Sequence, residues 1–187
     1  MPLGNSITWG KSNLQPPAPG THGYRKYLYD ILHADYNVQF VGPYTQWYDS
    51  TNTQQYSPDG PYYGYYIDGA RIDNFLPGGV YNVTTQLNAM PVDSLPDVVL
   101  LHIGTNDIGT EQSVGNYDEP GTILFELDSL LHVLLNYNRS GHTIDHIFLC
   151  KIIPVAPTDE FPGQNTKILD YNSSMNLLLE SLSSSNR

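Results

Sequence analysis

The chain has 187 residues and carries 8 Lys and Arg against 19 Asp and Glu, which gives a formal net charge of −11 at pH 7. This length fits one domain with a buried core, and the negative charge disfavours binding to nucleic acid phosphates and to anionic membrane surfaces. The apolar runs are far shorter than the ~20 residues that span a bilayer, and the lone Cys150 excludes an internal disulfide and a cysteine metal cluster.

The first half of the chain predicts a strand, a helix and a second strand before a long irregular segment. Residues 1–4 end at a turn-forming glycine and fit the tail of a first strand. Residues 23–34 carry the apolar stripe of a helix with one buried face, formed by Tyr24, Tyr27, Leu28, Ile31 and Leu32. Residues 38–42 fit a short second strand. Residues 43–68 are rich in Tyr, Pro and Gly without a regular period, and such long loops are usually functional or disordered.

The second half alternates strands with helices. Residues 97–103 form an unalternating apolar run, which is typical of a central parallel strand covered on both faces. Helices are expected at 122–135 and 166–182, on either side of a further strand at 147–153. This order predicts an α/β fold, a doubly wound parallel sheet in three layers, with residues 1–187 as a single domain.

Three polar turns lie where such a sheet builds its sites, near the carboxyl ends of the strands. Gly4-Asn5-Ser6 follows the first strand and exposes the Ser6 hydroxyl. Asp68-Gly69-Ala70 places a glycine N–H ahead of a short amphipathic segment. Gly104-Thr105-Asn106-Asp107 follows the central strand, with Asn106 as a neutral donor to an oxyanion and Asp107 as a brace for the loop. Taken singly, each turn is more typical of plain turn or cap chemistry.

In this order, the three turns resemble the blocks of the SGNH (GDSL-type) hydrolase family, which read G-D-S, a lone Gly and G-x-N-D before a terminal D-x-x-H. The resemblance covers nearly the whole chain, through PLGNSITWG, GYRKYLYDIL, GARIDNF and DVVLLHIGTNDIGT, and is strongest for the acetylxylan-esterase-like carbohydrate-esterase branch. It implies a flavodoxin-like sheet and a serine esterase or deacetylase that needs no cofactor. By the same resemblance, Ser6 is the nucleophile, the Ser6 N–H, the Gly69 N–H and the Asn106 amide form the oxyanion hole, and Asn5 and Asp107 belong to the substrate site.

Two departures from the family pattern affect the expected chemistry. Asn5 replaces the usual Asp, which removes a charge beside Ser6 but keeps a hydrogen-bonding side chain of the same size, so we expect tuned rather than lost activity. No D-x-x-H follows the last helix, so we expect the domain to lack its last strand and helix, and to be slightly incomplete at the N-terminus. A serine without a general base is a poor nucleophile.

The other histidines offer no clear substitute for that base. Residues 30–33 match D-x-x-H but form part of the first helix, on a surface turn. His102 is expected to be a core histidine with satisfied hydrogen bonds, while His142 and His146 flank the fourth strand at the edge opposite the site. His22 has a path to Ser6 through the Pro-rich loop, but nothing further supports it. No H-E-x-x-H spacing occurs, and the histidines lie apart in the predicted fold, so no metal site is expected.

Eight aromatic residues occupy positions 44–66, ahead of Gly69. Rings with polar tips suit stacking on sugars at a groove, and we predict that Tyr65 and Tyr66 contact the substrate. Packing of the loop onto the domain is an equal alternative.

The rival hypothesis is a non-catalytic descendant, a carbohydrate-binding or assembly module whose uncovered sheet edge pairs with another chain. A third possibility is an enzyme whose remaining segment is carried separately. We expect the protein to be secreted, in agreement with N-x-S/T sequons at Asn82, Asn138 and Asn172.

Overall fold

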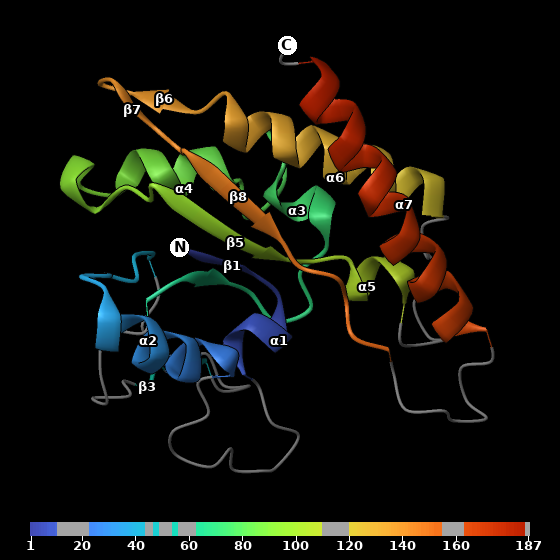
Figure 1. Cartoon of the computed structure of the whole chain (residues 1–187), viewed down its shortest axis with the longest axis horizontal. Helices are drawn as coiled ribbons and strands as arrows, with labels where there is room; N and C mark the ends of the chain where they lie inside the picture. Colours follow the sequence, from blue (N-terminus) through green and yellow to red (C-terminus); the bar gives the residue numbers. More distant parts are fainter. Residues whose placement is uncertain are drawn as a thin grey trace.

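The computed structural model of the chain describes residues 1–10, 23–43, 47–48, 54–55, 63–109, 120–154 and 163–185. Its centre is a parallel sheet in the order β4-β1-β5-β8, formed by Tyr65–Tyr66, Pro2–Gly4, Val98–His102 and His146–Leu149 (Figure 1). Two antiparallel pairs accompany it, β2 (Trp47–Tyr48) with β3 (Gln54–Gln55) and β6 (Asn138–Arg139) with β7 (His142–Thr143). The α/β class predicted from the sequence is confirmed.

Helices cover both faces of the sheet, as expected for a three-layer fold (Figure 1). On one face lie α1 (Ser6–Trp9) and α2 (Tyr24–Asp35). On the other lie α3 (Ile72–Phe75), α6 (Pro120–Leu135) and α7 (Gln164–Ser185), the last two close to their predicted bounds. The remaining described helices are α4 (Val83–Ala89), the 3₁₀ helix η1 (Val92–Ser94) and α5 (Thr105–Ile108). Within the described residues, no helix combines the length and apolar character needed to cross a membrane.

The main core lies between the sheet and the α3, α6 and α7 layer. Alternate residues of β1 and β5 point into it, and one side of α6 faces them. These side chains are buried: Leu3, Val99, Leu101, Ile103, Ile123, Leu127, Leu130, Leu131 and Leu134. The helix expected at 122–135 is therefore confirmed, and the burial of its apolar side from water is the main favourable term for this layer.

The strand beside β1 lies elsewhere than predicted. Residues 38–42 form no strand, and Tyr65–Tyr66, inside the stretch predicted to be irregular, pairs with β1 as β4. The backbones of Gly42 and Gly64 are in direct contact, because a Cβ on Gly42 would lie 2.3 Å from the Gly64 carbonyl carbon. A two-residue strand carries too little pattern to be recognised, so its pairing with β1 decides its structure.

Helix α2 buries only part of the predicted stripe, because Tyr24, Leu28 and Leu32 are partly buried while its other two members are exposed. Tyr27 and Ile31, both in the predicted stripe, are 73% and 67% exposed, whereas Arg25 is buried. The inward face also includes Arg25 and Tyr29, which with Leu28 and Leu32 have the spacing i, i+3, i+4, i+7, so it is rotated relative to the predicted stripe. The sequence did not indicate that Arg25 belongs to the buried face, because charged residues are rarely buried.

Gly4 lies where β1 has no room for a side chain. A Cβ there would be 2.2 Å from the His102 carbonyl oxygen and 2.4 Å from the Thr8 hydroxyl. We expect Gly4→Ala to lower the free energy of unfolding by about 3 kcal/mol or more, because the His102 oxygen belongs to the paired backbone of β5 and cannot move aside. Denaturant unfolding measures this loss.

Gly121→Ala is the matched control for that substitution. Gly121 is exposed on α6, and a Cβ there would meet nothing within 4 Å. Its stability should stay within about 1 kcal/mol of the starting chain. Equal stability of the two variants would contradict the close packing at Gly4.

Candidate active site

The carboxyl ends of β1, β4 and β5 meet at one edge of the sheet. Gly4 lies opposite Tyr66 on one side and His102 on the other, and the Ile67 N–H donates to the Gly4 oxygen at 3.0 Å. The segments that follow these strands therefore leave the sheet as neighbours, with α1 and α5 at this edge (Figure 1). Ser6, Gly69 and Asn106 lie two, three and four residues beyond the paired ends.

Ser6 is the first residue of the short helix α1. The Asn5 side chain caps this helix by accepting a hydrogen bond from the Ile7 N–H at 3.0 Å. Gly10 closes the helix in the left-handed conformation, with its N–H 2.9 Å from the Ser6 oxygen. Ser6 itself is partly exposed. The turn thus presents Ser6 at a helix N-terminus, where its backbone N–H has no partner within the helix.

The Asn106 loop is bonded directly to the segment that carries Gly69. The Asn106 Nδ2 donates to the Ala70 oxygen at 2.8 Å, and the Asp107 Oδ1 accepts from the Ile72 N–H at 2.9 Å. An amide nitrogen carries two N–H groups, so the bond to Ala70 orients the side chain and leaves a second donor on the same atom. The structure therefore joins two of the three predicted turns by hydrogen bonds.

The backbone conformation at position 69 favours glycine, whereas the space around it would admit a side chain. Its φ is +69°, which L side chains rarely adopt, and a Cβ would meet nothing within 4 Å. The residue is exposed, and its N–H finds no acceptor among the described residues. This is the geometry expected of a backbone donor that faces solvent or a ligand, and its role in an oxyanion hole stays a prediction.

The four residues predicted to contact substrate are buried at this edge instead. Asn5 and Asp107 are enclosed and hold α1 and α3 by the bonds described above. Tyr65 packs edge-on against Phe75 and donates its hydroxyl to the Tyr81 oxygen at 2.6 Å. Tyr66 is buried against α2. Because strand pairing turns Tyr65 and Tyr66 to the two covered faces of the sheet, neither ring offers a face to a sugar, and the prediction is corrected for them.

Most of the other aromatic residues predicted to line a sugar-binding groove lie outside the described residues. Tyr63 is exposed, whereas the side chains of Trp47 and Tyr48 and the whole of residues 44–46, 49–53 and 56–62 lie outside the described residues.

Burial raises the pKa of the Asp107 carboxyl from its ordinary 3.8 to about 7, although the Ile72 N–H and the Arg71 charge lower it. The Asp107 Oδ2 is buried without a hydrogen-bond partner in the described structure. Below about pH 7 the group is therefore mainly neutral. A neutral carboxyl beside Asn106 does not repel negative charge that develops on a bound substrate.

Asp107→Asn is expected to be stabilised relative to the starting chain by an amount that grows as the pH rises. Between about pH 4 and about pH 7 the unfolded chain has an ionised Asp107 while the folded chain keeps the proton, so the starting chain loses stability in this window and not above it. Asn retains the acceptor for the Ile72 N–H. Denaturant unfolding across this range measures the difference, and a difference that does not change with pH would contradict the raised pKa.

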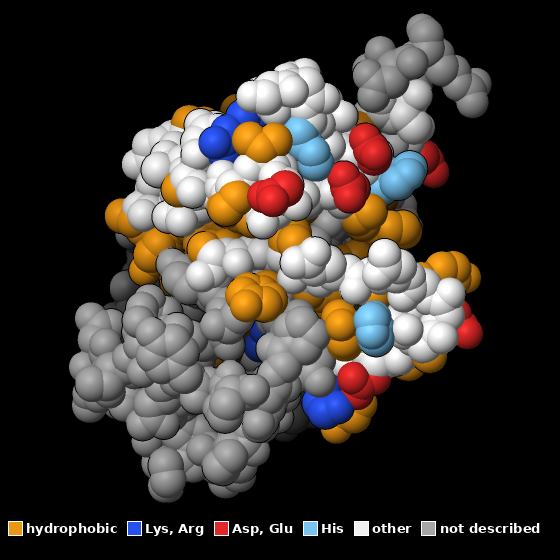
Figure 2. All heavy atoms as spheres, turned by 90° about the vertical axis from the view of Figure 1, so that its left-hand side faces the viewer, with side chains coloured by type: hydrophobic (Ala, Val, Ile, Leu, Met, Phe, Trp, Pro, Cys, Tyr) orange, Lys and Arg blue, Asp and Glu red, His pale blue; other side chains and the backbone are white. Residues whose placement is uncertain are grey.

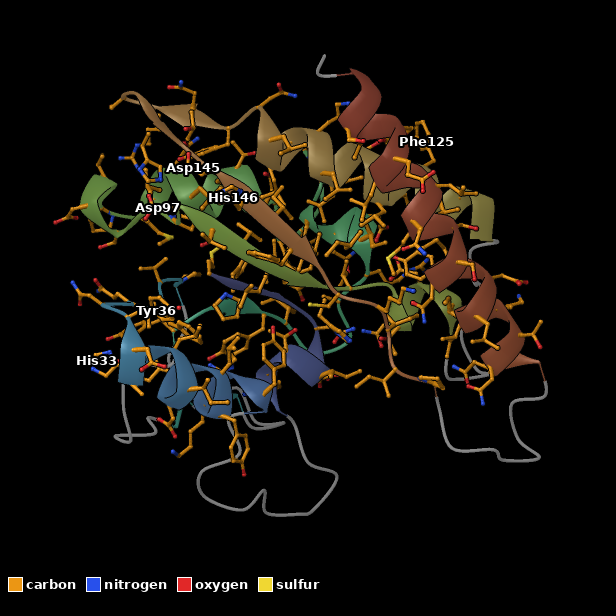
Figure 3. All side chains as sticks on the ribbon, viewed as in Figure 1. His33, Tyr36, Asp97, Phe125, Asp145 and His146 are labelled. Atoms are coloured by element: carbon orange, nitrogen blue, oxygen red, sulfur yellow. The ribbon has the colours of Figure 1, made fainter. Side chains whose placement is uncertain are left out.

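The described histidines are placed away from Ser6 or lack a bond to it. Figure 3 shows His33 at the far end of α2, where its ring stacks on Tyr29 at 5.0 Å. His146 lies with Asp97 and Asp145 near the amino ends of β5 and β8, an end where Figure 2 shows histidine and acidic side chains gathered. His142 bonds to the Pro96 oxygen at this same end. His22 lies outside the described residues.

His102 differs from its prediction. It is buried as expected, but neither ring nitrogen has a hydrogen-bond partner among the described residues. Burial lowers its pKa, because a charged imidazolium would be poorly solvated there. Among the described histidines, none is hydrogen-bonded to Ser6.

Arg25 is a residue of this edge that the sequence did not single out. Its guanidinium bonds to the carbonyls at the end of α1 and to Tyr66 of β4. The sequence pattern that could have indicated it is the helical spacing of Arg25 with Leu28, Tyr29 and Leu32, in which the arginine is followed by apolar residues on the same face of α2.

The whole chain is similar to known acylhydrolases and esterases. A model of the GDSL-like lipase/acylhydrolase family matches residues 1–186. A multidomain esterase of Ruminococcus flavefaciens is 32% identical over 203 residues, and the match covers 100% of this chain and 23% of the esterase, so the chain spans less than a quarter of that relative. A Clostridium thermocellum family 3 carbohydrate esterase has the same fold, with a TM-score of 0.58 at 20% identity over 100% of this chain and 73% of that one. The resemblance predicted from the motifs is confirmed, and the chain belongs to the GDSL-like lipase/acylhydrolase family.

Proposed function

We propose that this chain hydrolyses O-acyl esters, with Ser6 as the nucleophile and with the Ser6 N–H, the Gly69 N–H and the Asn106 amide binding the oxyanion. The observation that carries the proposal is the register of β1, β4 and β5, which brings these three segments out at one edge of the sheet. The bond between Asn106 and Ala70 supports it, because a donor that is already oriented stabilises developing charge without reorganisation.

In this mechanism the Ser6 Oγ attacks the acyl carbon, and the negative charge moves onto the carbonyl oxygen. The Ser6 proton passes to a general base and then to the leaving alcohol, which leaves an acyl group on Ser6. Water, deprotonated by the same base, releases the acid and restores Ser6. We propose a histidine as this base, without assigning it to one of the described residues. No step needs a metal or an organic cofactor.

We propose an acetyl group on a carbohydrate as the substrate, in a protein that acts outside the cell. The support is the multidomain esterase and the family 3 carbohydrate esterase that the chain resembles. Rates on acetyl, butyryl and octanoyl esters of one alcohol test the acyl preference, and we expect the acetyl ester to be hydrolysed fastest. A faster octanoyl ester would contradict the acetyl proposal while leaving the serine mechanism intact.

An organophosphonate probe tests the nucleophile. Such a probe phosphonylates an activated serine and ignores ordinary ones, because it mimics the tetrahedral intermediate. We expect one adduct per chain, on the peptide that contains Ser6, together with loss of ester hydrolysis. Hydrolysis that persists with Ser6 fully labelled, or an adduct on another serine, would contradict the proposal.

A second candidate is a non-catalytic module that binds carbohydrate or another chain. The observation in its favour is β8, which pairs only with β5 among the described residues and exposes 60% of Phe148. In this case the chain would bind an acetylated xylan oligosaccharide, as measured by calorimetry, while leaving both the ester and the probe untouched. Probe labelling at Ser6 would exclude this candidate.

A further inference from the structure

Arg25 is a buried cation that connects three elements of the candidate active site. It lies on the inward face of α2 with 2% of its surface exposed. Its Nε donates to the Thr8 oxygen at 2.9 Å and its Nη2 to the Trp9 oxygen at 3.0 Å, while its Nη1 donates to the Tyr66 hydroxyl at 3.0 Å. The guanidinium carbon also lies 4.1 Å from the centre of the Tyr66 ring.

The helix that Arg25 holds has little stability of its own. Helix α1 has four residues, and so short a helix does not persist without tertiary contacts. Its last carbonyls have no partners within the helix, and the helix dipole makes that end negative. The fork of N–H groups on Arg25 meets two of these carbonyls at once, which a lysine ammonium would do with less defined geometry.

The third contact links this helix to the strand that leads to the oxyanion segment. Tyr66 ends β4, and Gly69 follows it three residues later. Arg25 therefore fixes the far end of α1 relative to β4, while Asn5 caps the near end at Ser6. A shift at Thr8 and Trp9 would move Ser6, because α1 is a single turn.

We propose that Arg25 is a positioning residue for the nucleophile, which holds α1 so that Ser6 stays aligned with Gly69 and Asn106. This rests on the proposed function of Ser6. Arg25 touches neither Ser6 nor the reacting atoms by any bond described above, so it acts through the placement of α1. A displacement of about 1 Å in a reacting group can lower the rate about 100-fold.

The structure supplies a matched control for removal of such an arginine. Arg139 donates its Nη1 to the Leu87 oxygen at 3.1 Å and to the Met90 oxygen at 2.6 Å, at the end of α4. It thus makes the same kind of contact, an arginine on the last carbonyls of a helix. Because β6 and α4 lie away from α1 and α5 (Figure 1), its removal tests lost stability without a change at Ser6.

The experiment compares Arg25→Met, Arg25→Lys, Tyr66→Phe and Arg139→Met with the starting chain on a small acetyl ester. We expect kcat to fall about 100-fold in Arg25→Met with KM changed by less than about threefold. Arg25→Lys should restore part of that loss, and Tyr66→Phe should cost less than Arg25→Met, because the ring and two of the three hydrogen bonds remain. Arg139→Met should keep kcat within about twofold of the starting chain, even if its free energy of unfolding falls by as much as that of Arg25→Met.

Hydrogen exchange gives a readout that does not depend on activity. In the Ser6→Ala background, Arg25→Met should speed exchange of the amides of residues 5–10 and leave those of α6 unchanged. Unchanged exchange in residues 5–10, an equal rise in α6, or a kcat within about twofold of the starting chain would each overturn the proposal.

The two proposals fail in different ways. If the starting chain hydrolyses no ester, the proposed function fails, and exchange alone decides whether Arg25 holds α1. If Arg25→Met does not fold, Arg25→Lys and Tyr66→Phe carry the same comparison.

Discussion

Replacing Ser6 with alanine is expected to lower kcat/KM for a small acetyl ester by about a thousandfold or more. The substitution removes the only atom that forms the covalent acyl intermediate in the proposed mechanism, and loss of a catalytic serine has effects of this size or larger in serine hydrolases. The fold should be unaffected, because Asn5 and Gly10 cap α1 by groups that the substitution keeps. Initial rates and thermal unfolding of the same preparations measure both effects.

Ser129→Ala is the control for this substitution. Ser129 is partly exposed on α6, and its hydroxyl donates to the Phe125 oxygen within the same helix. Its rate should equal that of the starting chain. Equal rates for Ser6→Ala and Ser129→Ala would remove the serine mechanism altogether.

Asn106→Ala is expected to lower kcat by about 100-fold to 1000-fold, the effect of removing one oxyanion donor in other hydrolases. The second N–H of the Asn106 amide is available to a bound oxygen, and alanine removes it together with the bond to Ala70. The Asp107 bond to the Ile72 N–H remains, so the loop keeps its connection to α3. Steady-state rates on the acetyl ester give kcat and KM separately.

The two parameters distinguish the proposed role of Asn106 from simple substrate binding. A donor that acts on the transition state lowers kcat, whereas one that binds the ground state and the transition state equally raises KM alone. Asn136→Ala is the control, since Asn136 is exposed just after α6 and its amide also donates to a backbone oxygen, that of His132. A raised KM with unchanged kcat in Asn106→Ala would refute the oxyanion role.

The helices and strands that contain long apolar runs could be predicted from the sequence. Those that form only because they pair with a neighbouring strand could not. The strand β5 and the helix α6 bury long apolar runs, so their pattern alone locates them. The two-residue strand β4 exists because β1 pairs with it, and nothing within Tyr65–Tyr66 distinguishes it from a loop. Because this pairing was not predicted, Tyr65 and Tyr66 were expected to contact substrate, whereas both rings are buried.

The candidate site shows the same division. The order of the motifs led to Ser6, Gly69 and Asn106, since each follows or precedes a recognisable turn. The bonds that link them could not be predicted, because the contact of Asn106 with Ala70 spans 36 residues and depends on how two loops pack. Arg25 was missed because burial of a charge runs against the usual preference of such residues for water.

Helix α7 encloses the Asn106 loop from both ends. The Tyr171 hydroxyl donates to the Ile103 oxygen at 3.4 Å just before the loop, and its ring lies against Gly104, where a Cβ would come within 2.9 Å of it. The Gln164 side chain donates to the Gly109 oxygen just after the loop. Any shortened version of this domain made for crystallisation or screening must therefore retain residues up to at least Met175, because trimming α7 would release the loop and also expose the core that Ile168, Tyr171 and Met175 help to form.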